Sequence, residues 1–307
     1  MARLRGARSI VVAMGLWAVA GIEKSTAQEF EAGLLDVTQA SAGDWHHIQF
    51  NQGFTAAPVV VLGPLSARNS QGATLRVRDV TSTGFEFQID EWDYLDGSHP
   101  SEQVSFLALA EGTHTIGGLR WEAARLPAVN RQSSPATCEQ SYSSSPLVLA
   151  QIEGEANPQS LAARVHDVSP SGYAISIGSE EANANLALND ETVATIAIQT
   201  GSGSLGDLSF QVGLVPSPVA RSWSPLSFAA HASHPVLLAG IQTKNSPDPA
   251  VLRMRALSPA GVEFRCDEER SADNERSLPG EQVGYLAIAG QVVQGTEADA
   301  RIEFGDV

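Results

Sequence analysis

Three stretches of this chain, far apart in the sequence, are near copies of one another, and this repetition limits the possible folds more than any other feature. They are LRVRDVTSTGFEFQID from Leu75, AARVHDVSPSGYAISI from Ala162 and LRMRALSPAGVEFRCD from Leu252. They align without gaps on Gly84, Gly172 and Gly261, which are 88 and 89 residues apart. A period near 90 residues is too long for a solenoid turn or a propeller blade, and it indicates a small domain present three times.

Segments on both sides of the glycines keep the same period. A proline and an apolar run precede each copy: PVVVLG, PLVLAQ and PVLLAG. A second apolar run follows each copy: VSFLALA, VATIAIQ and VGYLAIA. The repeats predict three modules, at residues 28–118, 119–207 and 208–307, which leave no room for a separate catalytic domain.

Each module is expected to consist of strands. In GFEFQID the apolar residues Phe85, Phe87 and Ile89 alternate with polar ones, which is the period of a strand with one buried face. The turn sequences VTSTG, VSPSG and LSPAG end in a glycine, which tolerates backbone conformations that other residues resist. VVVLG and FLALA are expected to be buried on both faces. With no sustained helical periodicity, the sequence predicts an all-β protein in which each module is a six-stranded antiparallel sandwich.

The first residues are typical of a secretory leader. A basic start is followed by the apolar run 9–21, which is too short to span a bilayer. Small residues suited to cleavage follow as Ala18-x-Ala20 or Ser25-x-Ala27, and the second pair predicts a leader of residues 1–27. The expected location is therefore secreted, extracellular or at the cell surface, with a short membrane-anchoring helix as the alternative.

The net charge excludes two classes of partner, and the cysteine count leaves the presence of a disulfide open. The formal net charge is −16, and loss of the leader removes three net positive charges to leave about −19. Such a surface repels nucleic acid and anionic lipid, so neither is expected as a partner. The two cysteines, Cys138 and Cys266, are equally compatible with separate buried thiols and with a bridge between modules.

The first module carries the pattern of a known family. The segments are IQFNQGFTAAPVVVLGPLS from Ile48, the hairpin VTSTGFEFQIDEWDYLD and the closing run VSFLALA. Together they resemble the H-type lectin domain, the GalNAc-binding module of snail agglutinins and of discoidin C-terminal domains. The resemblance implies six-stranded sandwiches that associate as trimers and hold sugar at the boundary between neighbours. Three linked copies are then expected to close with pseudo-threefold symmetry, rather than to form a string of separate domains.

The resemblance also implies candidate sugar-binding residues. The family's aromatic-polar pair falls on Trp92 and Asp93, and weaker candidates are Arg76, Asp44 and His99. Sugar recognition needs an aromatic face together with polar groups that orient hydroxyls, which this set offers. A role for Trp92 as a core or rim residue is an equal alternative.

The other two modules lack the aromatic residue. Glu180 and Glu269 stand where the first module has Trp92, so sugar binding is expected mainly in the first module. Arg76 has equivalents in Arg164 and Arg253, and this recurrence favours a structural role, such as ion pairing between modules, over ligand contact.

The chain shows no signature of an enzyme: it contains no HExxH, GxSxG, phosphate-binding glycine loop or CxxC. The acidic run DEWDYLDG lacks the spacing of a calcium loop, so no metal or other cofactor is expected. The sequence predicts a non-catalytic lectin whose partners are glycans or glycoconjugates. The alternative is an adhesive surface component that has lost sugar binding and self-associates, with the final IEFGDV pairing with an opening strand in its own or a second chain. A secreted hydrolase is a weaker third alternative.

Overall fold

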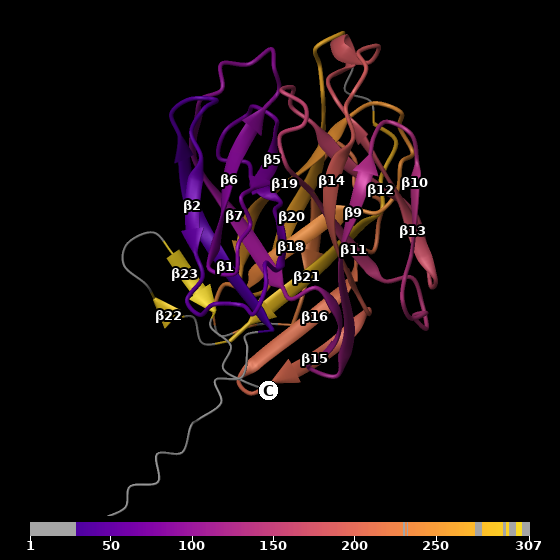
Figure 1. The fold of residues 1–307 in the computed structure, drawn as a ribbon. Coiled ribbons are helices and arrows are strands. Elements are labelled where there is room, and N and C mark those ends of the chain that lie inside the picture. The colour runs from indigo at the N-terminus through magenta and orange to yellow at the C-terminus, as the bar shows by residue number, and fades with distance from the viewer. Residues whose placement is uncertain are drawn as a thin grey trace, which may run out of the picture.

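The computed structural model describes residues 29–229, 231, 233–273 and 278–290, together with the backbone of 293–294 and 299–302. The predicted leader, residues 1–27, lies outside the described residues. Figure 1 shows an all-β molecule, and the short 3-10 helix η1 (Glu181–Asn183) is the one helical element in the described part of the chain. In that same part, no helix has the length and apolar character needed to cross a bilayer.

The first strand group covers residues 30–109. On one side lie β1 (Phe30–Gln39), β7 (His99–Leu109) and β3 (Val59–Leu62). On the other side lie β2 (His46–Gln49), β6 (Gly84–Glu91) and β5 (Ala73–Arg78). Residues from both sides, including Phe85, Phe87 and Phe106, form one buried apolar cluster, so these strands enclose a core as the layers of a sandwich do.

The second strand group covers residues 112–198 and has the same order of strands. One side consists of β8 (Gly112–Ile116), β9 (Leu119–Val129), β14 (Glu191–Ile198) and β11 (Leu147–Glu153). The other consists of β10 (Ser134–Thr137), β13 (Gly172–Gly178) and β12 (Ala162–Ser169). A second apolar cluster, which includes Tyr173, Ile175 and Ile177, lies between them.

The third strand group covers residues 201–289. One sheet consists of β15 (Gly201–Leu205), β16 (Leu208–Leu214), β21 (Val283–Ala289) and β18 (Val236–Ile241). The other consists of β17 (Ser224–Ser227), β20 (Gly261–Glu268) and β19 (Ala250–Ser258), and β4 (Leu65–Ser66), from the first part of the chain, is added at its edge beside β19. A third cluster, with Phe264 and Cys266, fills the space between them. The expectation of an all-β, sandwich-like fold is therefore confirmed.

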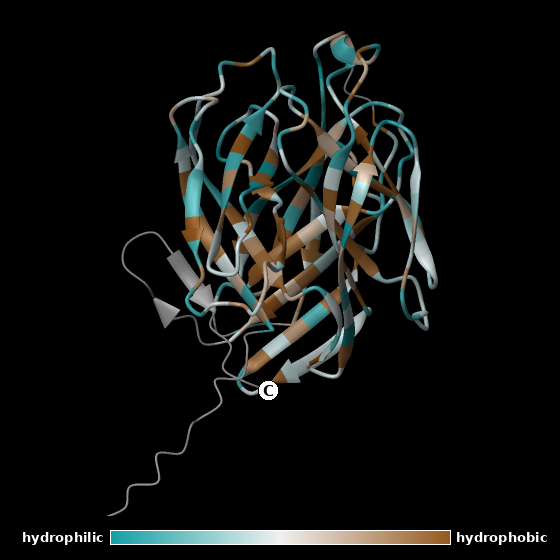
Figure 2. Ribbon diagram, viewed as in Figure 1, coloured by the Kyte–Doolittle hydropathy of each residue, from teal (hydrophilic) through white to brown (hydrophobic). Residues whose placement is uncertain are grey.

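A fourth apolar cluster joins the three strand groups. It takes alternate residues from strands such as β3 and β7: Val59 and Val61 belong to it, whereas Val60 belongs to the core of the first group. Equivalent strands β11, β14, β18 and β21 also contribute to this cluster. Strands that face a core on both sides must be apolar at every position, which explains the uninterrupted runs in the sequence. Figure 2 shows these hydrophobic segments along the strands in the middle of the molecule.

The repeated glycines have a different cause from the one that the sequence suggested. None of the three has a positive φ; that conformation occurs five residues earlier, at Asp79, Asp167 and Ala256. A Cβ on Gly84 would lie 2.3 Å from the carbonyl oxygen of Ile48, and the other two glycines are equally close to a neighbouring strand. The glycines are therefore required by close backbone approach, and the turns are bent elsewhere.

Three buried arginines connect the strand groups. Arg76 donates to the carbonyl oxygens of Asn157 (2.7 Å) and Gln159 (2.6 Å), which lie in the second group. Arg164 donates to Asp248 O (2.7 Å) in the third group and pairs with Glu281 (3.1 Å). Each arginine thus reaches a loop of the following strand group.

The third arginine, in the third strand group, contacts residues of the first strand group. Arg253 donates from Nε to Ser66 O at 3.0 Å and pairs with Glu102 at 2.9 Å, with both side chains fully buried. Its strand β19 also pairs with β4, through Arg253↔Leu65 and Met254↔Ser66. The contacts of the three arginines match the structural role that their recurrence favoured, and they run in a closed cycle through the three groups.

Each of the loops that the arginines reach is also held by a buried glutamate. Glu102 accepts from the amides of Arg68 (2.9 Å) and Asn69 (2.8 Å), and Glu191 accepts from Asn157 N at 2.9 Å. Glu281 accepts from Asn245 N at 3.0 Å. Buried backbone amides in irregular loops need such acceptors, because burial without a partner costs about 1–3 kcal/mol for each group.

Candidate functional site

The five residues that the sequence singled out do not form one open site. Asp44 folds back on its own loop, where its carboxylate accepts from Ala40 N and Ser41 N, both at 2.9 Å. Hydrogen bonds from the Ser41 hydroxyl and from the Ala40 amide hold the pKa of Asp44 below its usual value. The carboxylate thus caps backbone amides three and four residues before it and orders its own loop.

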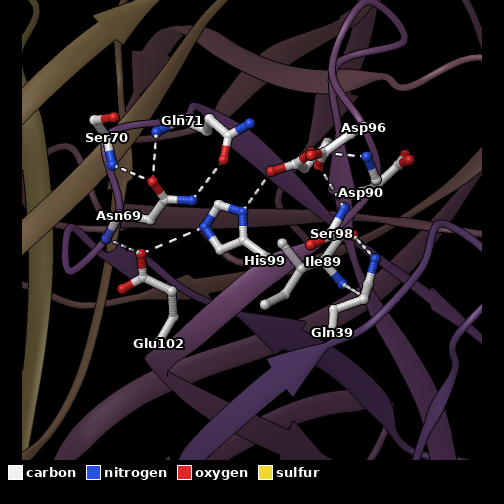
Figure 3. Close-up of polar contacts among 12 residues, drawn as sticks. Gln39, Asn69, Ser70, Gln71, Ile89, Asp90, Asp96, Ser98, His99 and Glu102 are labelled. Atoms are coloured by element: carbon white, nitrogen blue, oxygen red, sulfur yellow. Dashed lines mark hydrogen bonds and ion pairs between the residues drawn. The ribbon is translucent and has the colours of Figure 1, made fainter.

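His99 is fully buried in a network of charged groups. Its Nδ1 lies 2.7 Å from Glu91 Oε1 and its Nε2 lies 3.3 Å from Glu102 Oε1. Figure 3 shows the ring beside Glu102, which in turn accepts from the amide of Asn69. Burial alone would raise the pKa of Glu102, but hydrogen bonds from His99 and from the Ser66 hydroxyl hold it below its usual value. In this structure His99 supports the loop that Arg253 contacts.

Arg76 is also buried, with 4% of its surface exposed. Besides its two carbonyl contacts, its Nε lies 3.3 Å from Asp90 Oδ2. Burial raises the pKa of Asp90 to about 6 in spite of this arginine, because the loss of hydration outweighs the attraction. All of the contacts of Arg76 are to the protein itself, at the junction of the first and second strand groups.

Trp92 and Asp93 lie where the strand groups meet. Trp92 is 1% exposed and forms a small apolar cluster with Ala162 of the second group and Val251 of the third. Asp93 accepts from Ser160 N at 3.0 Å and from the Asn183 side chain at 3.2 Å. Trp92 is therefore held by residues from all three groups.

A cavity of about 230 Å³ opens beside Trp92, between the first and third strand groups. From the first group it is lined by Ser70, Gly72, Trp92 and Tyr94, and from the third by Arg221, Arg265, Asp267, Glu268 and Arg270. Tyr94 is 42% exposed, so its ring is available to solvent at this cavity. Of these residues the sequence identified only Trp92.

The cavity residues that the sequence did not identify are brought beside Trp92 by contacts between strand groups. Arg265 and Arg270 stand in FRCDEER, directly after the third repeated glycine, about 170 residues away from Trp92 in the sequence. The sequence pointed to them in one way. If the three modules pack with pseudo-threefold symmetry, the end of the third hairpin lies beside the first module. The sequence does not indicate which of its side chains meet there.

At the positions equivalent to Trp92, the two glutamates have structural contacts. Glu180 accepts from Tyr94 N at 3.0 Å, and Glu269 accepts from Glu181 N at 2.7 Å. Burial raises the pKa of Glu180, which is consistent with a carboxylate placed between neighbouring loops. These positions hold hairpin ends against one another and offer no aromatic face.

Three carboxylates from different loops come close together near the same cavity. Oxygens of Glu181, Asp248 and Glu268 lie within 4.8 Å of one another. Burial and then repulsion from Asp248 and Glu269 raise the pKa of Glu181 to about 7. The raised pKa favours protonation of Glu181, which lowers the negative charge of this cluster.

The two cysteines are separate buried thiols, and no bridge joins them. Cys138 belongs to the core of the second strand group and Cys266 to the core of the third. Burial raises the pKa of Cys138 to about 11 and that of Cys266 to about 12, so neither thiol is poised to react.

One part of this all-β chain is similar to a known family of lectin domains. Residues 45–109, which include Trp92 and Asp93, match the family described as the H-type lectin domain. The matched segment holds most strands of the first group and the first-group side of the cavity.

The chain is also similar to a particular protein, halomucin from Haloquadratum walsbyi. The two are 29% identical over 257 residues, which is 79% of this chain and 3% of halomucin. The chain therefore spans only a small part of the length of this relative. No solved structure matches the chain.

Proposed function

We propose that this chain is a non-catalytic carbohydrate-binding protein whose main site is the cavity beside Trp92 and Tyr94. The observation that carries the proposal is this cavity, which combines an exposed aromatic ring with several charged side chains at a boundary between strand groups. Such a combination suits the apolar face and the hydroxyls of a sugar ring. The family match over residues 45–109 supports it, since that segment provides Trp92 and Tyr94.

The proposal includes three tandem lectin-like modules, at residues 28–118, 119–207 and 208–307, closed about a pseudo-threefold axis. It is supported by the three equivalent arginine contacts, by the separate core of each strand group and by the apolar cluster that all three share. A smaller cavity of about 130 Å³ is lined by equivalent segments of all three groups around Gly63, Gln151 and Gly240, as expected along such an axis.

The proposed ligands are galactose and GalNAc-type glycans, and the proposed location is extracellular or at a cell surface. The lectin-domain match and the similarity to a protein named as a mucin support this location. In the binding mode we propose, Tyr94 stacks on the sugar and Trp92 fixes the floor of the cavity.

A glycan array followed by calorimetric titration tests the function. Binding of galactose-type sugars is expected, and Tyr94→Ala is expected to weaken it about tenfold through loss of one stacking face. Leu214→Ala is the matched control, because Leu214 is similarly exposed (43%) and does not line the cavity. The absence of binding to any glycan would refute the proposal.

The second candidate is an adhesive or structural component that self-associates. One observation favours it: Glu180 and Glu269 hold neighbouring loops rather than offer a ring. The other edge of β1 lies beside β23 (Asp299–Ile302), which pairs in turn with β22 (Val293–Gln294). In the structure β23 pairs with β1 of the same chain, from Leu35↔Asp299 to Ala32↔Ile302. Light scattering separates the candidates, since a concentration-independent monomer fits pairing within the chain and steady growth fits a filament.

A further inference from the structure

The cavity beside Trp92 differs from the rest of the molecule in its charge. The chain as a whole carries a formal net charge of −16. The cavity is nevertheless lined by three arginines and two carboxylates, all five from the third strand group. A concentration of cations in one cavity of a strongly acidic protein calls for an explanation in terms of its ligand.

One of the three arginines is already neutralised by the protein. Arg265 pairs with Asp267 at 2.8 Å and lies 4.6 Å above the ring of Trp223. Its guanidinium is therefore held in place on the outer face of β20. It forms a fixed wall of the cavity, with its charge largely balanced by Asp267.

The other two arginines are differently placed. Within the described part of the chain, neither Arg221 nor Arg270 forms an ion pair with a carboxylate. Arg221 is exposed, and Arg270 makes a hydrogen bond to the side chain of Tyr94. These two cations thus line the cavity beside Tyr94, together with the carboxylate of Glu268.

This arrangement is specific to one junction. The end of the second hairpin presents Glu180 and Glu181 to its neighbours, and the end of the third presents Glu269. Neither of those ends carries an aromatic residue at the position of Trp92. Among the residues that the structure describes, the boundary between the first and third groups is where the exposed side chain of Tyr94 meets two arginines that form no ion pair with a carboxylate.

From these contacts we infer that the cavity selects acidic sugars, that is, saccharides that carry a carboxylate or a sulfate. This inference rests on the proposed function and specifies its ligand class. The sugar ring lies against Tyr94, and its anionic group is bound by Arg221 and Arg270. Arginine suits this role because its planar donors match the geometry of carboxylate and sulfate oxygens. Glu268 and the nearby Glu181 disfavour an anion placed on their side, so they orient the ligand toward the arginines.

Calorimetric titration of the full chain with matched sugar pairs tests the inference. The probes are methyl galactoside, methyl galacturonide and galactose 6-sulfate, each in about 0.15 M and about 1 M NaCl, where the screening length falls from about 8 to about 3 Å. At the lower salt concentration both acidic sugars are expected to bind at least about tenfold more tightly than the neutral one. The difference is expected to shrink at the higher salt concentration.

Two variants locate the effect. Arg221→Ala is expected to weaken binding of the acidic sugars about tenfold and to leave the neutral sugar within about twofold, and Arg221→Glu is expected to reverse the preference. Arg221 is exposed, so both variants are expected to fold. Arg78→Ala is the matched control: it removes the same charge from a partly exposed arginine that pairs with Glu86 and lies outside the cavity.

The outcomes are distinct. Equal affinity for neutral and acidic sugars refutes the acidic preference and leaves the proposed function standing. A preference that survives Arg221→Glu refutes the assignment of the anion to this cavity. Failure of every sugar, neutral or acidic, refutes the proposed function and the inference together.

Discussion

The buried arginine contacts and the hairpin ends recur in all three strand groups, but their residues agree to different degrees. All three positions, Arg76, Arg164 and Arg253, keep the same residue type and the same kind of partner, the carbonyl groups of a loop in another strand group. At the hairpin ends, by contrast, Trp92 is replaced by glutamates. The arginine type is thus kept in all three strand groups, whereas the residue at the hairpin end is an aromatic in one group and a glutamate in the other two. The unequal agreement shows that the arginine contacts require one residue type and that the contacts at the hairpin ends are made by different ones.

The largest expected loss of stability comes from removing the contact of Arg253 with the first strand group. Arg253→Met leaves Glu102 buried without its cationic partner, and such a change typically costs about 3–5 kcal/mol of unfolding free energy. Chemical denaturation followed by tryptophan fluorescence measures it. Arg68→Ala, which removes an arginine from an exposed pair with Asp36, is expected to cost less than about 1 kcal/mol. Equal losses in the two variants would contradict the structural role of Arg253.

At the hairpin ends, the comparison predicts unequal effects of equivalent substitutions. Trp92→Ala removes a side chain packed between Ala162 and Val251 and is expected to cost about 3–5 kcal/mol. Glu180→Ala removes one acceptor for a backbone amide and is expected to cost about 1–2 kcal/mol. The same denaturation experiment distinguishes them. A loss below about 1 kcal/mol for Trp92→Ala would mean that the ring is not part of the core.

Asp90 belongs to both regions, because it pairs with Arg76 and stands two residues before Trp92. Its pKa of about 6 lies above the value of about 3.9 expected in the unfolded chain. The folded state therefore binds the Asp90 proton more tightly than the unfolded chain does. The stabilisation that this adds to the free energy of unfolding is fully present below pH about 4 and is lost as the pH rises to about 6. The loss amounts to at most about 3 kcal/mol.

Urea denaturation of the native chain and of Asp90→Asn, between pH 4 and 7, isolates this contribution. The substitution is expected to flatten the decline in stability between pH 4 and 6 and to leave the rest of the profile in place. An unchanged slope in Asp90→Asn would assign the decline to other carboxylates, such as Glu181.

The smallest expected effect concerns the thiols, which belong to the sandwich cores rather than to either region. Cys138 and Cys266 are buried, with pKa values of about 11 and 12. Both are expected to resist a thiol reagent at pH 8 until the chain unfolds, and reducing agents are expected to leave stability unchanged. Labelling monitored by mass spectrometry checks this, and rapid modification of either thiol in the native protein would contradict its burial.

The sequence predicted the strands, their two-sided burial and the structural use of the arginines, because periodicity and internal repetition reflect local and repeated contacts. It gave the wrong reason for the glycines, since the approach of another strand to Gly84 depends on tertiary packing. It also could not place His99, which its neighbours Glu91 and Glu102 enclose only in the folded chain. The meeting of Tyr94 with Arg221 and Arg270 depends on side chains far apart in sequence, for which the repeat offers no pattern.

A crystal structure of the chain with a bound acidic galactoside tests directly whether the boundary between the first and third strand groups binds sugar. We expect the sugar ring on Tyr94, with its anionic group within hydrogen-bond distance of Arg221 or Arg270. A sugar ordered anywhere else on the molecule, with this cavity left to solvent, would contradict it.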